Sequence, residues 1–109
     1  MDASQLTQEV TRLHAEICSA LADPTRILLL YALHERPRTV SELAAALTLS
    51  QPAASRHLKV LRDRGLVHTT RQGQSIEYGL NDPRIIDALD TLRAVLRDTL
   101  AFRAQLISE

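Results

Sequence analysis

The stretch TVSELAAALTLSQPAASRHLKVLRDRGLV, which spans residues 39–67, decides the fold class of this chain. It contains two short helical patterns separated by residues 48–50. The first opens with a capping box, in which the side chains of Thr39 and Glu42 can each bond the other residue's backbone amide. Two short helices joined by a brief turn predict a helix-turn-helix, whose second helix can enter the major groove of DNA.

The second helix of this pair has clear boundaries and a polar outer face. It begins at Ser50 with Pro52 in its first turn, where a missing amide removes no hydrogen bond. Gly65 suits the left-handed conformation that commonly ends a helix. The apolar face consists of Ala54, Leu58 and Leu61, and the opposite face carries Gln51, Ser55, Arg56, Lys59 and Arg62.

Two further helices are predicted upstream of the pair. The first covers residues 4–19 and carries one apolar stripe with helical spacing. The second opens with Asp23 as its cap and Pro24 in its first turn, and it extends to Glu35. Its run ILLLYAL is apolar nearly all round, which predicts a central buried helix.

Downstream of the helix pair, the spacing of apolar residues changes from a helical period to alternation with polar residues. Residues 66–71 and 75–80 form two strands of a hairpin, with its tip at residues 72–74. A last helix covers residues 82–106 and carries an apolar stripe. This stripe consists of Ile85, Leu89, Leu92, Leu96 and Leu100. The expected architecture is a mainly α chain with a small β-hairpin.

Composition places these elements in one domain, residues 1–109. Hydrophobic residues make up 45% and charged residues 24%, as in globular proteins. The single cysteine excludes an intramolecular disulfide. The first residues lack the basic and apolar regions of a signal peptide, and the apolar run 27–33 is far short of the roughly 20 residues that span a membrane. A cytoplasmic location without membrane contact is expected.

The formal net charge of +0 conceals a basic block. Residues 50–78 contain five lysines and arginines against two acidic residues. Besides the second helix of the pair, this block includes the hairpin tip, where Arg71 and Gln72 stand beside Gly73. A polar helix face alone is commonly just a solvated surface. A basic helix followed directly by a basic hairpin favours nucleic-acid binding over that reading.

Three stretches together resemble the ArsR/SmtB family of bacterial repressors. They are LADPTRILLLYAL, the quoted segment 39–67, and RQGQSIEYGL, within a likeness that covers about residues 13–100. The resemblance implies a winged helix-turn-helix with a DNA-binding core at about 22–80. It also implies a homodimer through helices 4–19 and 82–106, double-stranded operator DNA as partner, and release by an effector. By position it assigns DNA contacts to Gln51, Ser55, Arg56, His57, Lys59, Arg71 and Gln72.

The metal-binding residues by which members of that family sense their effectors are missing from this sequence. The expected third helix has no cysteine and the last helix has no histidine, whereas soft-metal sites need two or three thiolates. No cofactor is therefore expected, and no effector can be assigned. His14 and Cys18 stand four apart on one helix, so a dimer could form a shared zinc or redox site from them. The alternative is that Cys18 is a packing residue.

The expected function is a homodimeric, sequence-specific transcriptional repressor. No glycine-rich phosphate loop or metalloprotease motif is present, so a small enzyme is disfavoured. A winged-helix module that binds protein instead of DNA remains an alternative. Retention of Arg56, Lys59 and Arg71 argues against that alternative.

Overall fold

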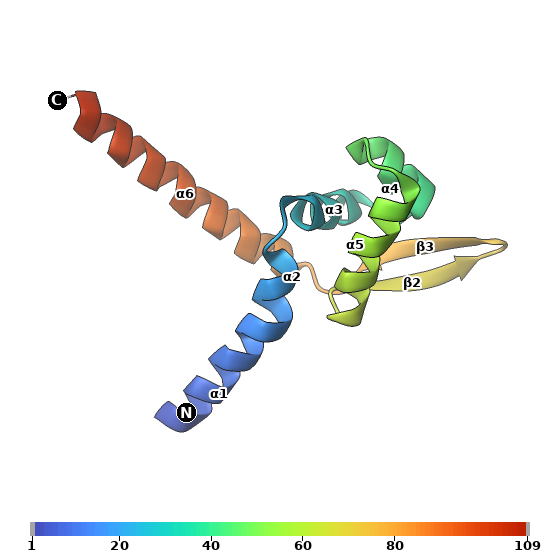
Figure 1. Cartoon of the computed structure of the whole chain (residues 1–109), viewed down its shortest axis with the longest axis horizontal. Coiled ribbons are helices and arrows are strands. Elements are labelled where there is room, and N and C mark those ends of the chain that lie inside the picture. Colours follow the sequence, from blue (N-terminus) through green and yellow to red (C-terminus); the bar gives the residue numbers. More distant parts are fainter. Residues whose placement is uncertain (1, 109) are drawn as a thin grey trace.

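The computed structural model describes residues 2–108 and consists of helices around one small antiparallel sheet, with two long helical arms (Figure 1). The N-terminal arm is α1 (Ala3–Leu13), a π-helical segment η1 (His14–Cys18) and α2 (Ser19–Leu21). A regular helix was expected over residues 4–19, so the π-helical segment is a correction. The spacing of apolar residues cannot reveal it, because one wide turn leaves them on the same side of the helix.

Helix α3 (Pro24–Glu35) lies at the centre of the domain. The carboxylate of Asp23 accepts hydrogen bonds from the amides of Thr25 and Arg26, as its predicted role of cap requires. Partial burial raises the pKa of Asp23, but these two amides and the neighbouring basic side chains together outweigh it, so that pKa is below its usual value. Leu29, Leu30 and Leu33 are buried, whereas Leu28 is 53% exposed. The expectation of burial on all sides is therefore wrong for one face of α3.

Helices α4 (Val40–Leu47) and α5 (Gln51–Asp63) form the helix-turn-helix. The predicted capping box is present, with Thr39 and Glu42 bonding each other's backbone amides. The hydrogen bond from the amide of Thr39 is the largest single cause that lowers the pKa of Glu42. The turn between the helices places Thr48 in the left-handed region at φ 55°. At the end of α5, Gly65 has φ 76°, as predicted for a left-handed cap.

The wing is a three-stranded sheet, which corrects the expected two-stranded hairpin. Strand β2 (Val67–Gln72) and β3 (Ser75–Leu80) pair antiparallel around Gly73, whose φ is 63°. A short strand β1 (Arg38–Thr39) pairs with the other edge of β3. A strand of two residues is too short to produce a recognisable alternating pattern in the sequence. Its pairing with β3 depends on where the end of α3 lies relative to β3.

The hydrophobic core lies between α3, α5, the sheet and the start of α6 (Arg84–Ser108). Its fully buried large side chains are Leu29, Leu30, Leu43, Leu58, Leu61 and Val67. The apolar stripe of α6 is divided in two. Ile85 packs against this core and Leu89 is buried in it, whereas Leu92, Leu96 and Leu100 are at least 50% exposed on the projecting part.

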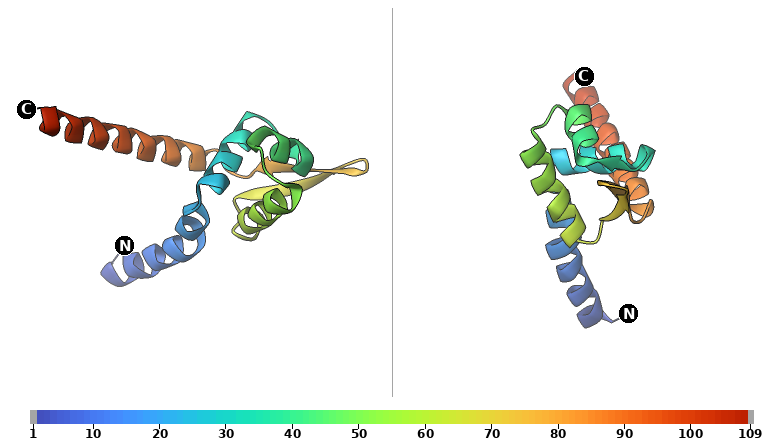
Figure 2. Two further views of the ribbon diagram at one scale, coloured as in Figure 1. Left: turned by 45° about the horizontal axis from the view of Figure 1, so that its top comes forward. Right: turned by 90° about the vertical axis from the view of Figure 1, so that its right-hand side faces the viewer.

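Both arms leave the core in different directions (Figures 1 and 2). The radius of gyration is 17.0 Å, compared with about 13 Å for a compact domain of this length. The excess comes from the arms, since the remaining elements pack around one core. Within residues 2–108, no helix is both long enough and apolar enough to cross a membrane.

Candidate nucleic-acid interface

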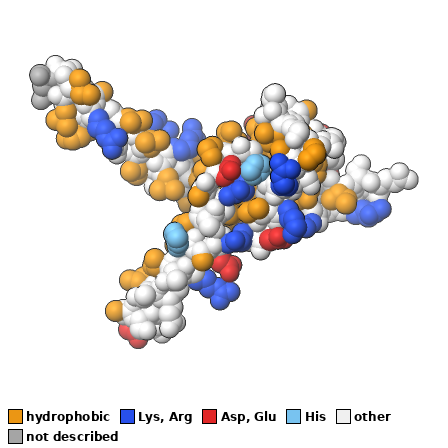
Figure 3. Space-filling view, in the orientation of Figure 1, with side chains coloured by type: hydrophobic (Ala, Val, Ile, Leu, Met, Phe, Trp, Pro, Cys, Tyr) orange, Lys and Arg blue, Asp and Glu red, His pale blue; other side chains and the backbone are white. Residues whose placement is uncertain are grey.

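Helix α5 presents one buried and one open face. Ala54, Leu58 and Leu61 are buried against the core, which fixes the rotation of α5 about its axis. The opposite side is exposed and carries the side chains that the sequence predicts to contact DNA: Gln51, Ser55, Arg56 and Lys59. The space-filling view shows basic side chains over the region of α5 and on the wing, and apolar side chains along the arms together with further basic ones (Figure 3).

The N-terminal end of α5 combines an ordered amide side chain with helix amides. The hydroxyl of Ser50 accepts a hydrogen bond from the amide of Ala53 and caps the helix. Nε2 of Gln51 donates to the hydroxyl of Ser41 at 2.7 Å, which links the two helices of the motif and orients the Gln51 amide. Ser41 was not predicted as part of the site. Helix N-termini attract phosphate, and an oriented glutamine can read a base edge.

Two basic side chains on the open face of α5 differ in their surroundings. Nζ of Lys59 lies 2.9 Å from a carboxylate oxygen of Asp63, one turn further along. This hydrogen bond is the main cause that lowers the pKa of Asp63. Both partners are exposed, so the pair contributes little stability and can exchange for a phosphate contact. Among residues 2–108, Arg56 has no ion-pair partner.

The wing places a second basic position beyond α5. Arg71 pairs with Ile76 in the ladder, and Gln72 pairs with Ser75 next to the tip. Both Arg71 and Gln72 are exposed, and Arg71 has no acidic partner in the part of the chain that the structure describes. A twisted hairpin of this kind can follow the DNA backbone or enter the minor groove.

The base of the wing is held by a polar network. Nδ1 of His68 lies 2.5 Å from Oδ1 of Asn81, and Nδ2 of Asn81 donates to the carbonyl of Gly65 at 2.7 Å. The His68 ring covers Gly79, where a Cβ would lie 2.8 Å from Nε2 of His68. This network connects the end of α5, the first residues of β2 and the segment before α6.

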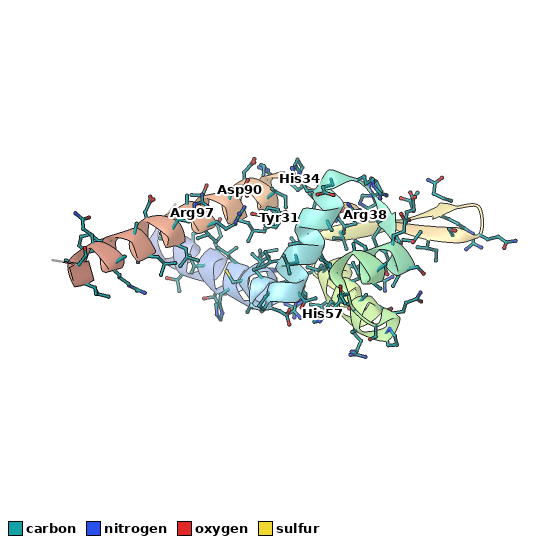
Figure 4. All side chains as sticks on the ribbon, turned by 90° about the horizontal axis from the view of Figure 1, so that it is seen from above. Tyr31, His34, Arg38, His57, Asp90 and Arg97 are labelled. Atoms are coloured by element: carbon teal, nitrogen blue, oxygen red, sulfur yellow. The ribbon has the colours of Figure 1, made fainter. Side chains whose placement is uncertain are left out.

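His57, the remaining predicted DNA contact, has a different environment from the others. It is half-buried, and its Nδ1 lies 3.4 Å from Nη1 of Arg26 on α3. Figure 4 shows His57 beside α3. Arg64 also belongs to the basic block, but its side chain points away from the open face of α5 and toward the N-terminal arm. Its Nη1 contacts the carbonyl of Ala15 and lies 3.1 Å from the hydroxyl of Ser19. No sequence motif predicts these two contacts.

The candidate metal ligands lie away from this surface. His14 and Cys18 both belong to the π-helical segment, and both are exposed. Cys18 is therefore not packed inside the isolated protomer. Within residues 2–108, no three histidine, cysteine or acidic side chains are grouped so that they could hold a metal ion.

The comparisons with known proteins decide the family. The family model for the arsR family of bacterial regulatory proteins matches residues 23–69, from the cap of α3 into β2. The chain is 37% identical to a probable mercury resistance operon repressor of Streptomyces lividans, over 90% of this chain and 82% of that protein. The chain belongs to the ArsR family.

Further relatives match in sequence and in fold. The regulator NmtR of Mycobacterium tuberculosis is 42% identical over 70% of this chain and 63% of its own length. The crystal structure of Rv0081 from M. tuberculosis superimposes with a TM-score of 0.78 at 36% identity, covering 87% of this chain and 96% of that one. NolR from Sinorhizobium fredii gives a TM-score of 0.74 at 33% identity, covering 87% of this chain and 93% of NolR.

These relatives establish the general function. The chain is a DNA-binding transcriptional regulator with a winged helix-turn-helix fold, and its family consists of regulators and not of enzymes. The second helix of a helix-turn-helix is the one that can enter the major groove of DNA, and α5 has that position here.

Proposed function

We propose that this ArsR-family protein is a homodimeric repressor that binds a near-palindromic operator through α5 and the wing of each protomer. The observation that carries the proposal is the exposed face of α5, where Arg56 has no acidic partner among residues 2–108 and Lys59 has only a solvent-exposed one. A polar and basic face on a helix whose other side is firmly packed suits insertion into a major groove.

The arms supply the argument for a homodimer. Large apolar side chains on them are about half exposed or more: Leu6, Val10 and Leu13 on α1, and Leu92, Val95, Leu96, Leu100, Phe102 and Leu106 on α6. Contiguous apolar surface of this extent marks an interaction site. A second copy offers the same two helices, so a two-fold arrangement can cover both sets at once.

Two-fold pairing also gives the DNA geometry. Each protomer contributes one recognition helix, and a symmetric dimer binds half-sites about 34 Å apart, which is one turn of DNA. Repression follows when the bound dimer covers a promoter. The relatives from S. lividans and Synechocystis that are named as repressors support this direction of regulation over activation.

We further propose that operator binding needs no metal. The S. lividans relative is named for mercury resistance, yet one protomer of this chain has one thiol. Soft metals need two or three thiolates. A shared site from His14 and Cys18 of two protomers is the alternative, and both residues are accessible in the isolated protomer.

The test begins with selection of binding sites from random duplex DNA. Arg56→Ala, Lys59→Ala and Arg71→Ala are then measured on the selected site and on random DNA at several salt concentrations. Loss of a bidentate guanine contact costs roughly 1–3 kcal/mol on the selected site only. Loss of a phosphate contact weakens binding to both DNAs and reduces the salt slope.

Arg12→Ala provides the matched control, because it removes one exposed positive charge from α1, away from α5 and the wing. We expect the control to bind like the parent. The proposed DNA face is wrong if the α5 and wing variants also bind both DNAs like the parent.

A further inference from the structure

The π-helical segment changes which donors reach a backbone carbonyl of the N-terminal arm. In an α-helix the amide of Ser19 would donate to the carbonyl of Ala15, four residues earlier. Here it donates to the carbonyl of His14, five residues earlier. The carbonyl of Ala15 therefore does not receive the amide of Ser19, and the hydroxyl of Ser19 donates to it at 2.5 Å instead. π-helical turns are rare and occur frequently at functional sites.

Arg64 contacts the same carbonyl. It is the residue that ends α5, and its Nη1 donates to the carbonyl of Ala15 and lies 3.4 Å from the carbonyl of Glu16. The same nitrogen donates to the hydroxyl of Ser19 at 3.1 Å. One guanidinium from the recognition helix thus contacts three oxygens of a single helical turn in the N-terminal arm.

Arg26 makes a second connection at the end of the same arm. Its Nε donates to the carbonyl of Ala20 at 2.6 Å and its Nη2 to the carbonyl of Ser19 at 3.2 Å. The last carbonyls of a helix have no partner within it, and a positive charge there also suits the helix dipole. Nη1 of the same guanidinium lies 3.4 Å from Nδ1 of His57, in the middle of α5.

The recognition helix is therefore linked to the N-terminal arm at two positions along its length. Arg26 connects through His57, and Arg64 connects directly. Two separated attachments restrict rotation as well as distance, whereas one attachment would leave a hinge. Hydrogen bonds from a charged donor are also stronger than neutral ones. This explains why His57 and Arg64 face inward although they lie within a basic block.

We propose that Arg26 and Arg64 are positioning residues for DNA recognition, which fix the angle between α5 and the N-terminal arm and so set the half-site spacing that the protein accepts. This inference rests on the proposed homodimer, in which the arm forms part of the two-fold interface. A change in the angle of the arm displaces the two recognition helices relative to each other, while each α5 keeps its own contacts with a half-site.

The test compares the full operator with a single half-site. Arg64→Met keeps the length of the side chain but removes every donor, and Arg26→Met does the same at the second attachment. Arg12→Met is the matched control, because Arg12 is exposed on α1 away from the apolar stripe. Each protein is titrated onto a half-site and onto operators whose half-site spacing differs by roughly one or two base pairs from the selected optimum. Thermal unfolding and sedimentation check that each variant is folded and dimeric.

We expect Arg64→Met to bind the half-site as the parent does and the optimum operator roughly tenfold more weakly, because lost attachments spread the population over several orientations. The affinity of Arg64→Met should depend less on half-site spacing, or it should be highest at a different spacing. Arg26→Met should behave in the same way. Arg12→Met should match the parent on every DNA.

Three results would overturn the inference. One is an Arg64→Met variant with the spacing preference and operator affinity of the parent. Another is equal weakening on half-site and operator, which would make Arg64 a direct DNA contact. The third is a folded Arg64→Met variant that has become monomeric, since the arginine would then support the dimer and not the angle. Failure of the proposed function has a separate signature, since the parent itself would then show no spacing preference.

Discussion

A single charge placed on the projecting part of α6 should separate the protomers and abolish specific DNA binding. The substitution is Leu92→Glu. Leu92 is 60% exposed in the protomer and lies beyond Leu89, the last residue of α6 that is buried in the core. The change therefore leaves the core of the protomer intact and acts on the surface that the proposed dimer covers.

The expected magnitude follows from that exposed fraction. Full burial of a leucine side chain is worth roughly 1.5–3 kcal/mol. Because 60% of Leu92 remains to be covered, each protomer would lose about 1–2 kcal/mol and the dimer about 2–4 kcal/mol. This corresponds to dimerisation weakened by roughly 30- to 700-fold. Desolvation of two carboxylates near the two-fold axis increases the loss further.

The assay combines sedimentation equilibrium and DNA titration on one sample. Ala101→Glu is the matched control, because it adds the same charge to α6 at an exposed position off the stripe. We expect Leu92→Glu to sediment as a monomer at micromolar concentration, to retain its helical content and to lose specific operator binding. The control should remain dimeric and bind DNA. A Leu92→Glu variant that dimerises like the parent, or a monomeric parent that binds its operator with full affinity, would refute the reasoning.

Three further predictions concern the turn, the wing and the thiol. Thr48→Asn should raise the free energy of unfolding by about 1 kcal/mol, because Asn tolerates the left-handed φ of 55° better than a β-branched residue. The gain is measured as a higher urea midpoint at unchanged m-value. An unchanged midpoint would contradict strain at this turn. Gly79→Ala should cost roughly 1–3 kcal/mol in chemical unfolding, because its Cβ would lie 2.8 Å from the ring of His68. The same substitution should cost much less when it is made in a His68→Ala variant, which lacks that ring. Cys18→Ser should leave operator affinity unchanged with or without zinc or arsenite. One zinc per purified dimer, lost in both Cys18→Ser and His14→Ala, would instead establish the shared site.

Local signals in the sequence were sufficient for the helix-turn-helix. The capping box at Thr39 and Glu42, the Ser50 cap and the left-handed Gly65 each depend on atoms within a few residues of one another. Such features can be read from spacing, because the chain brings their atoms together in any fold that contains the helix or turn. The polar outer face of α5 was predictable for the same reason, since helical period alone separates it from Ala54, Leu58 and Leu61.

Features that depend on distant parts of the chain required the tertiary structure. Strand β1 exists because the end of α3 delivers residues 38–39 to the free edge of β3. The stripe of α6 is divided because the core ends at Leu89, which no periodicity can indicate. Ser41 and Gln51 meet only after the two helices of the motif have packed.

His57 and Arg64 show most clearly what the sequence alone cannot predict, because both turn toward the protein and away from the open face of α5. His57 and Arg64 have the residue types of DNA contacts, and in sequence they stand among Arg56, Lys59 and Arg62. Composition and helical period therefore determine that a basic recognition helix exists. The fold decides which of its basic side chains face outward, because Arg26 and the carbonyl of Ala15 reach His57 and Arg64 from segments at least 31 residues away.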